Sequence, residues 1–172
     1  FRYVGELRGM GFRRSANFWF ILSLIILSII IAWANYAGLL QLHVRIGPFF
    51  IHHWFSLTGS FYIALFTPIY YVMKRRDPRK TGTLLKLHTF GNVVSFGLIS
   101  IHFAQQISRP AQFFPSLQTG LALYPIVTLL VASGFLMRFR VISLPHNSLR
   151  FLHVSLTTAF YFTIWVHILH GL

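Results

Sequence analysis

The stretch ANFWFILSLIILSIIIAWANYAGLL, residues 16–40, decides the fold class because it carries no charged residue over its whole length. Crossing the hydrocarbon core of a bilayer takes about 20 predominantly apolar residues in a helix. The stretch is also longer than the apolar region of a signal peptide, about 7–15 residues. Hydrophobic residues make up 55% of the chain and charged residues only 10%, against about 25% charged in a soluble domain. We therefore interpret the chain as an integral membrane protein.

Four further stretches of similar character follow the first. Together they predict spans at about 17–40, 49–73, 84–106, 117–137 and 148–172. Each is too long for a strand of a membrane barrel and lacks the alternation of such a strand. Because unpaired backbone groups are costly in lipid, the spans are expected to be helices. The sequence thus predicts an all-α helix bundle that forms a single transmembrane domain over residues 1–172.

Lysine and arginine are distributed unequally between alternate segments. The segment before the first span and the loops after the second and fourth spans hold 13 of the 15 basic residues, whereas the opposite side holds only Arg45 and Arg109. The positive-inside rule then predicts an inside N-terminus and an outside C-terminus, in a cell membrane or an organelle's inner membrane. Basic residues beside spans contact anionic headgroups, so the net charge of +13 does not indicate nucleic-acid binding.

Four histidines lie inside predicted spans, in two pairs of equal spacing. His88 and His102 are 14 residues apart in HTFGNVVSFGLISIH, and His153 and His167 are 14 apart in HVSLTTAFYFTIWVH. In a helix, 14 residues return a side chain to within roughly 40° of the same face, about 21 Å further along the axis. An ionisable residue inside a span indicates a functional site.

The third and fifth spans run in the same direction, because one span separates them. His88 is then level with His153 near the inside, and His102 is level with His167 near the outside. Imidazole is a good ligand for haem iron, so we predict two haem b groups, each with two axial histidines. The alternative for any one such histidine is a hydrogen bond to a neighbouring helix. The chain has no cysteine, which excludes iron–sulfur clusters and covalent c-type haem.

Four residues near these ligands have two interpretations each. Gly91 and Gly97 would let a macrocycle approach the third span, or would serve ordinary small-residue helix packing. Lys86 and Arg150 are candidate contacts for the propionates of the inner haem, or are topology charges only.

The remaining histidines lie in or beside loops. His53 and His170 are candidates for an outer metal or substrate site, although interfacial histidines commonly face water. His170 is also an alternative outer haem ligand, but 17 residues place it roughly 100° away from the face of His153. We therefore prefer His167. No role is expected for His43 or His146.

The paired spacing resembles the di-haem core of ferric reductase-like transmembrane domains, and of b-type cytochromes more widely. LHTFGNVVSFGLISIH looks like the first ligand helix of that family, and RFLHVSLTTAFYFTIWVH, with Arg150 three residues before His153, looks like the second. The resemblance covers about residues 85–172, half of the chain, and it implies His88, His102, His153 and His167 as axial ligands. Members of the family usually have a sixth helix and a lobe that binds flavin and nicotinamide. This sequence has no GxGxxG motif, which would indicate such a nucleotide-binding lobe.

The expected function is that of a membrane cytochrome b subunit, which carries electrons across the bilayer through two bis-His haems within a larger redox complex. Other subunits would then supply the donor or acceptor. One alternative is the haem-bearing anchor of a respiratory dehydrogenase or hydrogenase that exchanges electrons with quinone. An alternative of another class is a haem-free structural or metal-handling bundle that uses His52, His53, His167 and His170.

Overall fold

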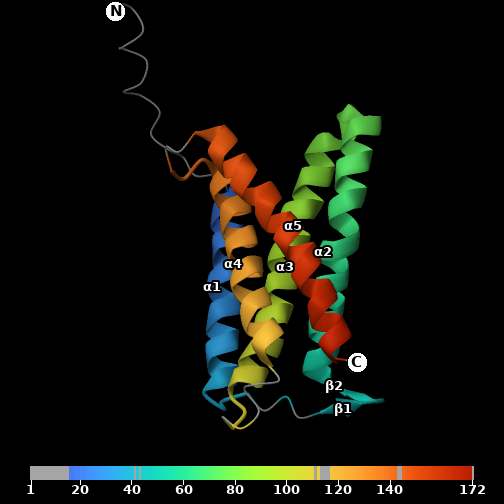
Figure 1. Ribbon diagram of the computed structural model, residues 1–172. Coiled ribbons are helices and arrows are strands. Elements are labelled where there is room, and N and C mark those ends of the chain that lie inside the picture. Colours follow the sequence, from blue (N-terminus) through green and yellow to red (C-terminus); the bar gives the residue numbers. More distant parts are fainter. Residues whose placement is uncertain are drawn as a thin grey trace, which may run out of the picture.

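Five helices that are long and apolar enough to cross a membrane make up most of the molecule (Figure 1). The computed structural model describes residues 16–40, 42, 44–110, 112, 117–142 and 145–171. The helices are α1 (Ala16–Tyr36), α2 (Ile51–Arg76), α3 (Thr81–Ile107), α4 (Gln118–Phe139) and α5 (His146–Gly171). The prediction of an all-α fold with five such helices is confirmed, with the helix ends shifted by a few residues.

The first helix ends earlier than predicted, at Tyr36 instead of about Leu40. Gly38 has a φ of +75°, a left-handed conformation that glycine adopts without steric cost. The N–H of Leu39 donates to the carbonyl of Ala34 at 2.9 Å, and the N–H of Gly38 donates to that of Asn35 at 3.2 Å. This pair of bonds is a Schellman motif, which closes the helix.

A small antiparallel hairpin between α1 and α2 was not predicted. Its strands, β1 (Arg45–Ile46) and β2 (Phe49–Phe50), pair Arg45 with Phe50 and Ile46 with Phe49. Gly47 has a φ of +62° at the first central position of the turn, as tight hairpins require. Trp54 of α2 donates its indole N–H to the Ile46 carbonyl at 2.9 Å, so the hairpin is fixed to the start of α2.

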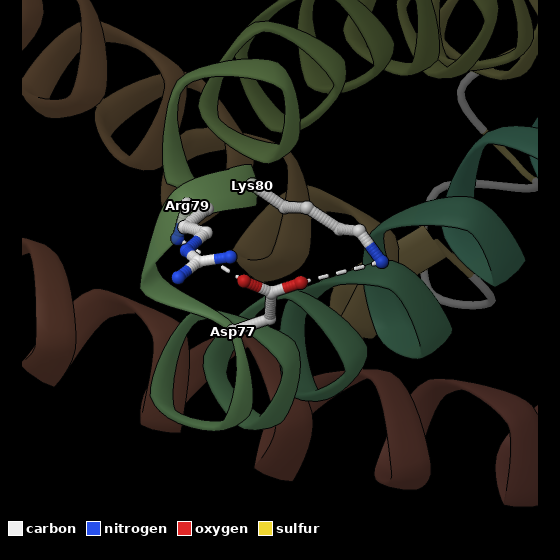
Figure 2. A network of polar contacts seen from close by, with 3 residues as sticks. All are labelled: Asp77, Arg79 and Lys80. Carbon is white, nitrogen blue, oxygen red and sulfur yellow. Dashed lines mark hydrogen bonds and ion pairs between the residues drawn. The ribbon is translucent and has the colours of Figure 1, made fainter.

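The turn between α2 and α3 is held by a polar network around Asp77 (Figure 2). The Asp77 carboxylate accepts a hydrogen bond from the backbone N–H of Arg79 at 3.2 Å and forms an ion pair with Lys80 at 3.3 Å. The 3₁₀ turn η2 (Pro78–Lys80) starts at this carboxylate. Its short reversal makes α2 and α3 antiparallel neighbours.

Helix α3 lies at the centre of the bundle, against α1, α2 and α4, and α5 packs mainly on α4. Polar side chains join the helices within the bundle, as is common in membranes. Asn35 of α1 is 1% exposed and donates to the Ile101 carbonyl of α3 at 3.0 Å. Tyr124 of α4 donates to Ser100 of α3 at 3.0 Å. Tyr161 of α5 donates to the Ala64 carbonyl of α2 at 2.7 Å.

The two ends of the bundle differ in charge. The start of α1, the α2–α3 turn and the start of α5 lie at one end, which we call the basic end (Figure 1). The hairpin, the end of α3 and the end of α5 lie at the other, the hairpin end. Basic residues of the basic end in the described chain are Lys74, Arg75, Arg76, Arg79, Lys80, Lys86, Arg138, Arg140 and Arg150. Arg45 and Arg109 lie at the hairpin end. The loops that were predicted to share one side, by their basic residues, therefore lie at the same end of the bundle.

Gly91 and Gly97 in the middle of α3 lie against neighbouring helices, which supports the packing interpretation of the two that the sequence left open. A Cβ atom at Gly91 would collide with the phenol ring of Tyr62 from α2. A Cβ atom at Gly97 would lie 2.7 Å from the hydroxyl of Ser28 in α1. Neighbouring helices therefore already occupy the space beside both glycines.

Candidate metal centres at two levels of the bundle

The predicted inner pair comes together near the basic end. His88 of α3 and His153 of α5 have ring centroids 6.5 Å apart, and their planes are nearly perpendicular at 81°. With metal–imidazole bonds of about 2 Å on each side, an ion between the rings would leave about 2.5 Å of that separation for the two ring radii. The centroid spacing is therefore compatible with two ligands on one ion.

The tautomer of His153 is set by helix α4. Ser133 Oγ lies 2.9 Å from His153 Nδ1 and 3.0 Å from the carbonyl oxygen of Leu130. Because a carbonyl can only accept, the Ser133 hydroxyl donates to Leu130 and accepts the Nδ1–H of His153. The Nε2 atom of His153 is then unprotonated, which is the form that ligates a metal.

His88 is oriented by its own helix and by α2. The Asn92 side-chain nitrogen lies 3.4 Å from both ring nitrogens of His88, and the Tyr70 ring stacks on the imidazole with centroids 4.7 Å apart. Asn92 Oδ1 is buried and has no hydrogen-bond partner in the described part of the chain. A buried acceptor without a partner is rare in folded proteins, and here it marks the edge of the His88–His153 pair.

His167 has the same kind of partner as His153, nearer the hairpin end. Its Nδ1 is hydrogen-bonded to Thr119 Oγ1 of α4 at 2.9 Å. A Cβ atom at Gly120 would lie 3.5 Å from His167 Cε1, and one at Gly134 would lie 3.2 Å from His153 Cε1. Each α5 imidazole is thus bonded to a hydroxyl of α4 and faces the glycine that follows it.

This repeat on α4 was missed in the sequence, although it is present there. Thr119-Gly120 and Ser133-Gly134 are 14 residues apart, the same spacing as His153 and His167. Because α4 and α5 are antiparallel neighbours, the first dipeptide meets the second histidine and the second dipeptide meets the first. A search of each span for polar residues at the histidine spacing would have found these partners.

His102 has neighbours that were not predicted. Its Nδ1 lies 3.2 Å from Nδ1 of His52, and its ring centroid lies 5.1 Å from that of His53. The ring contacts of His102 in the described residues are with His52 and His53, and not with His167. His88 and His153 thus lie near each other, His102 and His167 have no such ring contact among the described residues, and haem binding by either pair stays a prediction. When Nδ1 of His102 is the donor in this contact, Nε2 of His102 is unprotonated and can bind a metal.

The other candidate residues are distributed around the two levels. Lys86 and Arg150 are exposed at the basic end. His170 is exposed and hydrogen-bonded through Nδ1 to the Val166 carbonyl of its own helix at 2.9 Å, and the structure gathers His53 with His52 and His102 instead. His43 and the side chain of His146 fall outside the described part of the structure.

An apolar core lies between the two levels. Phe160 of α5, fully buried, stands seven residues from both His153 and His167. Around it pack buried residues of α2, α3, α4 and α5, namely Ile63, Phe96, Ile99, Leu123, Val127, Leu130 and Ile164. The core keeps the two histidine levels apart.

No protein-family model, characterised protein or solved structure matches this chain. The assignment of the site therefore depends on its own residues and their geometry.

Proposed function

We propose that this protein is a membrane cytochrome b subunit, with one haem b held by His88 and His153 and a second by His102 and His167. It would carry electrons across the bilayer as part of a larger redox complex whose other subunits supply the donor or acceptor. The observation that carries the proposal is the 6.5 Å separation of the His88 and His153 rings on α3 and α5. Chance packing of two partly buried histidines would rarely bring the rings to the separation expected of two axial imidazoles.

The partners of the rings support the same function. Nδ1 of His102, His153 and His167 each has a hydrogen-bond partner on a neighbouring helix, at 3.2, 2.9 and 2.9 Å. In metal sites the nitrogen that does not bind the metal is held in this way, which fixes ring orientation and raises ligand basicity. Because three rings share this arrangement, a role as metal ligands is favoured over a purely structural role. In a structural histidine both ring nitrogens would bond to protein.

Bound haem would supply a one-electron carrier at each level. The chain's own contribution is to hold its imidazoles at two depths and to fix the orientation of their rings through hydrogen bonds from neighbouring side chains. The core around Phe160 excludes water between these depths, and a dry, apolar surround is one of the factors that set the potential of a redox centre.

The test is a pyridine haemochrome assay on the native protein, with optical and EPR spectra. About two haems per chain are expected, and a chain without haem would contradict the proposal. His153→Ala should remove the haem shared with His88, because His88 alone would remain as its ligand. The spectrum of the other haem should stay unchanged. His170→Ala is the matched control, since it removes an exposed imidazole from the same helix. Loss of a haem in that control equal to the loss in His153→Ala would show the pairing to be wrong.

Purification of the native complex tests the second part of the proposal. A co-purifying flavin or iron–sulfur subunit would identify the chain as a haem-bearing anchor. If a quinol reduced the haems of this complex, as seen in their optical spectrum, quinone would be identified as the partner with which they exchange electrons.

A further inference from the structure

Three histidines gather at the hairpin end of the bundle. His52, His53 and His102 each offer a ring nitrogen, and these three atoms lie within 4.8 Å of one another. His52 and His53 stand in the first turn of α2, directly after the hairpin, and His102 stands near the end of α3. The rings of His52 and His53 have centroids 4.1 Å apart.

Hydrogen bonding alone does not account for this group. His52 is only 5% exposed, and Nδ1 of His53 is buried without a hydrogen-bond partner in the described residues. Helix α3 offers His53 only a weak contact, 3.5 Å from the Gln106 side-chain nitrogen to His53 Nε2. A buried nitrogen left in this state requires an explanation, and an ion bound by the three rings provides one.

We infer that His52, His53 and His102 form a binding site for a borderline divalent metal ion, Cu²⁺ or Zn²⁺. A tetrahedral ion with bonds of about 2.0–2.1 Å holds its nitrogen ligands about 3.3 Å apart, and the Nδ1 atoms of His52 and His102 are 3.2 Å apart.

The ligand set selects the class of ion. Imidazole suits copper and zinc, whereas Ca²⁺ and Mg²⁺ require oxygen ligands. Asp77, the acidic residue of the described chain, belongs to the basic end, so carboxylates do not contribute to this group.

A cavity provides access from the hairpin end and room for a fourth ligand. It has a volume of about 300 Å³ and is lined by Phe50, His52, Gln105, Ser108, Arg109 and Pro110. Three protein ligands and one open position are the arrangement of zinc sites that bind water or a substrate. Because Arg109 adds positive charge to the same wall, the fourth position favours water or an anion over a second cation.

The site does not depend on the proposed haems. His53 is not among the proposed haem ligands, whereas His52 contacts Nδ1 of His102. An ion bound by Nδ1 of His102 would replace that contact, and a ring that bound haem iron through Nε2 as well would have to lose its remaining proton. His53→Ala therefore reports on this site, and the haem content of His52→Ala shows whether that variant also disturbs His102.

The experiment is a Cu²⁺ titration of the intact, detergent-solubilised protein after treatment with a chelator, followed by EPR. We expect one Cu²⁺ per chain, with hyperfine splitting from about three nitrogens. His53→Ala and His52→Ala should each weaken Cu²⁺ binding about a hundredfold. Loss of a residue that only hydrogen-bonds to a metal ligand already weakens binding by about 10–100-fold, and loss of a ligand should cost at least as much. His170→Ala, which removes an exposed histidine from the same end, should bind Cu²⁺ as the wild type does.

Two results would overturn the inference. One is a wild-type spectrum without nitrogen splitting, which needs no variant and so does not depend on variant folding. The other is unchanged Cu²⁺ affinity in His53→Ala. Copper binding by a chain that carries no haem would support this site and contradict the cytochrome function, whereas two haems without copper binding would do the reverse.

Discussion

At the scale of single residues, the hydroxyl of Ser133 decides which nitrogen of His153 is free. Ser133→Ala removes the acceptor of the Nδ1–H, so the ring can change tautomer and rotate. Loss of such a partner weakens metal binding by about 10–100-fold. We therefore expect Ser133→Ala to release its haem about 10-fold more readily than the wild type and to shift that haem's midpoint potential. Haem transfer to apomyoglobin and a redox titration measure the two effects.

Two other hydroxyls of α4 provide comparisons for that variant. Thr119→Ala should affect the haem that we propose for His167 and leave the one proposed for His153. Thr128→Ala removes a hydroxyl that bonds only to the Tyr124 carbonyl of its own helix, at 2.9 Å, and should leave both haems unchanged. If Ser133→Ala behaved as Thr128→Ala does, the tautomer would be set by something other than the hydroxyl.

The levels of the four span histidines were predictable, and the α4 hydroxyls beside His153 and His167 could have been found from their equal spacing, but the neighbours of His102 could not. The equal spacing of His88–His102 and His153–His167 is a property of one-dimensional sequence, and helix geometry converts it directly into two levels. The contact of His52 with His102 depends on how the hairpin sets the rotation of α2, which the sequence does not reveal. Neighbours across helices therefore required the three-dimensional packing of the bundle.

At the scale of elements, α4 fixes the position of α5 through its two glycines. A side chain at Gly134 would begin 3.2 Å from His153 Cε1, and the methyl groups of valine would extend further into the ring. Overpacking of this kind costs about 1–3 kcal/mol and displaces the imidazole. Gly134→Val is therefore expected to lose the haem between His88 and His153 and to keep the other, as read from the haemochrome stoichiometry.

A glycine at the start of α3 provides the control for this variant. A Cβ atom at Gly82 meets nothing within 4 Å, so Gly82→Val changes helix propensity without crowding a ring. Both haems should remain in that variant. Retention of both haems in Gly134→Val as well would mean that α5 can move away from α4 without disturbing its ligands.

The five helices were predictable because each extends over a long run of apolar residues, whose length the bilayer thickness dictates. The ends of the helices were less predictable, because a helix end depends on local hydrogen bonds such as the one from the Gly38 N–H to the Asn35 carbonyl. The hairpin of Arg45–Ile46 and Phe49–Phe50 has strands of two residues each, too short for a strand pattern to show. The roles of Gly91 and Gly97 were also unpredictable, because the sequence does not say which helix faces them.

At the scale of the whole molecule, the two histidine levels and the charge of the ends form one arrangement. His88 and His153 lie in the halves of α3 and α5 nearer the basic end, and His102 and His167 in the halves nearer the hairpin end, with the core around Phe160 between them. If the basic end faces the inside, electrons that enter there and leave at the hairpin end move outward. The orientation of the bundle therefore decides from which side of the membrane a partner can reach each histidine level.

The absence of cysteine from the chain allows this orientation to be tested with single substitutions. Arg79 in the α2–α3 turn and Arg45 in the hairpin are both exposed and lie at opposite ends. From the positive-inside distribution, a membrane-impermeant maleimide should label Arg45→Cys in intact cells and label Arg79→Cys only after permeabilisation. Each substitution removes a single positive charge, which leaves the asymmetry between the ends large. Labelling of Arg79→Cys in intact cells, with Arg45→Cys protected until permeabilisation, would reverse the orientation and place the three-histidine group on the inside.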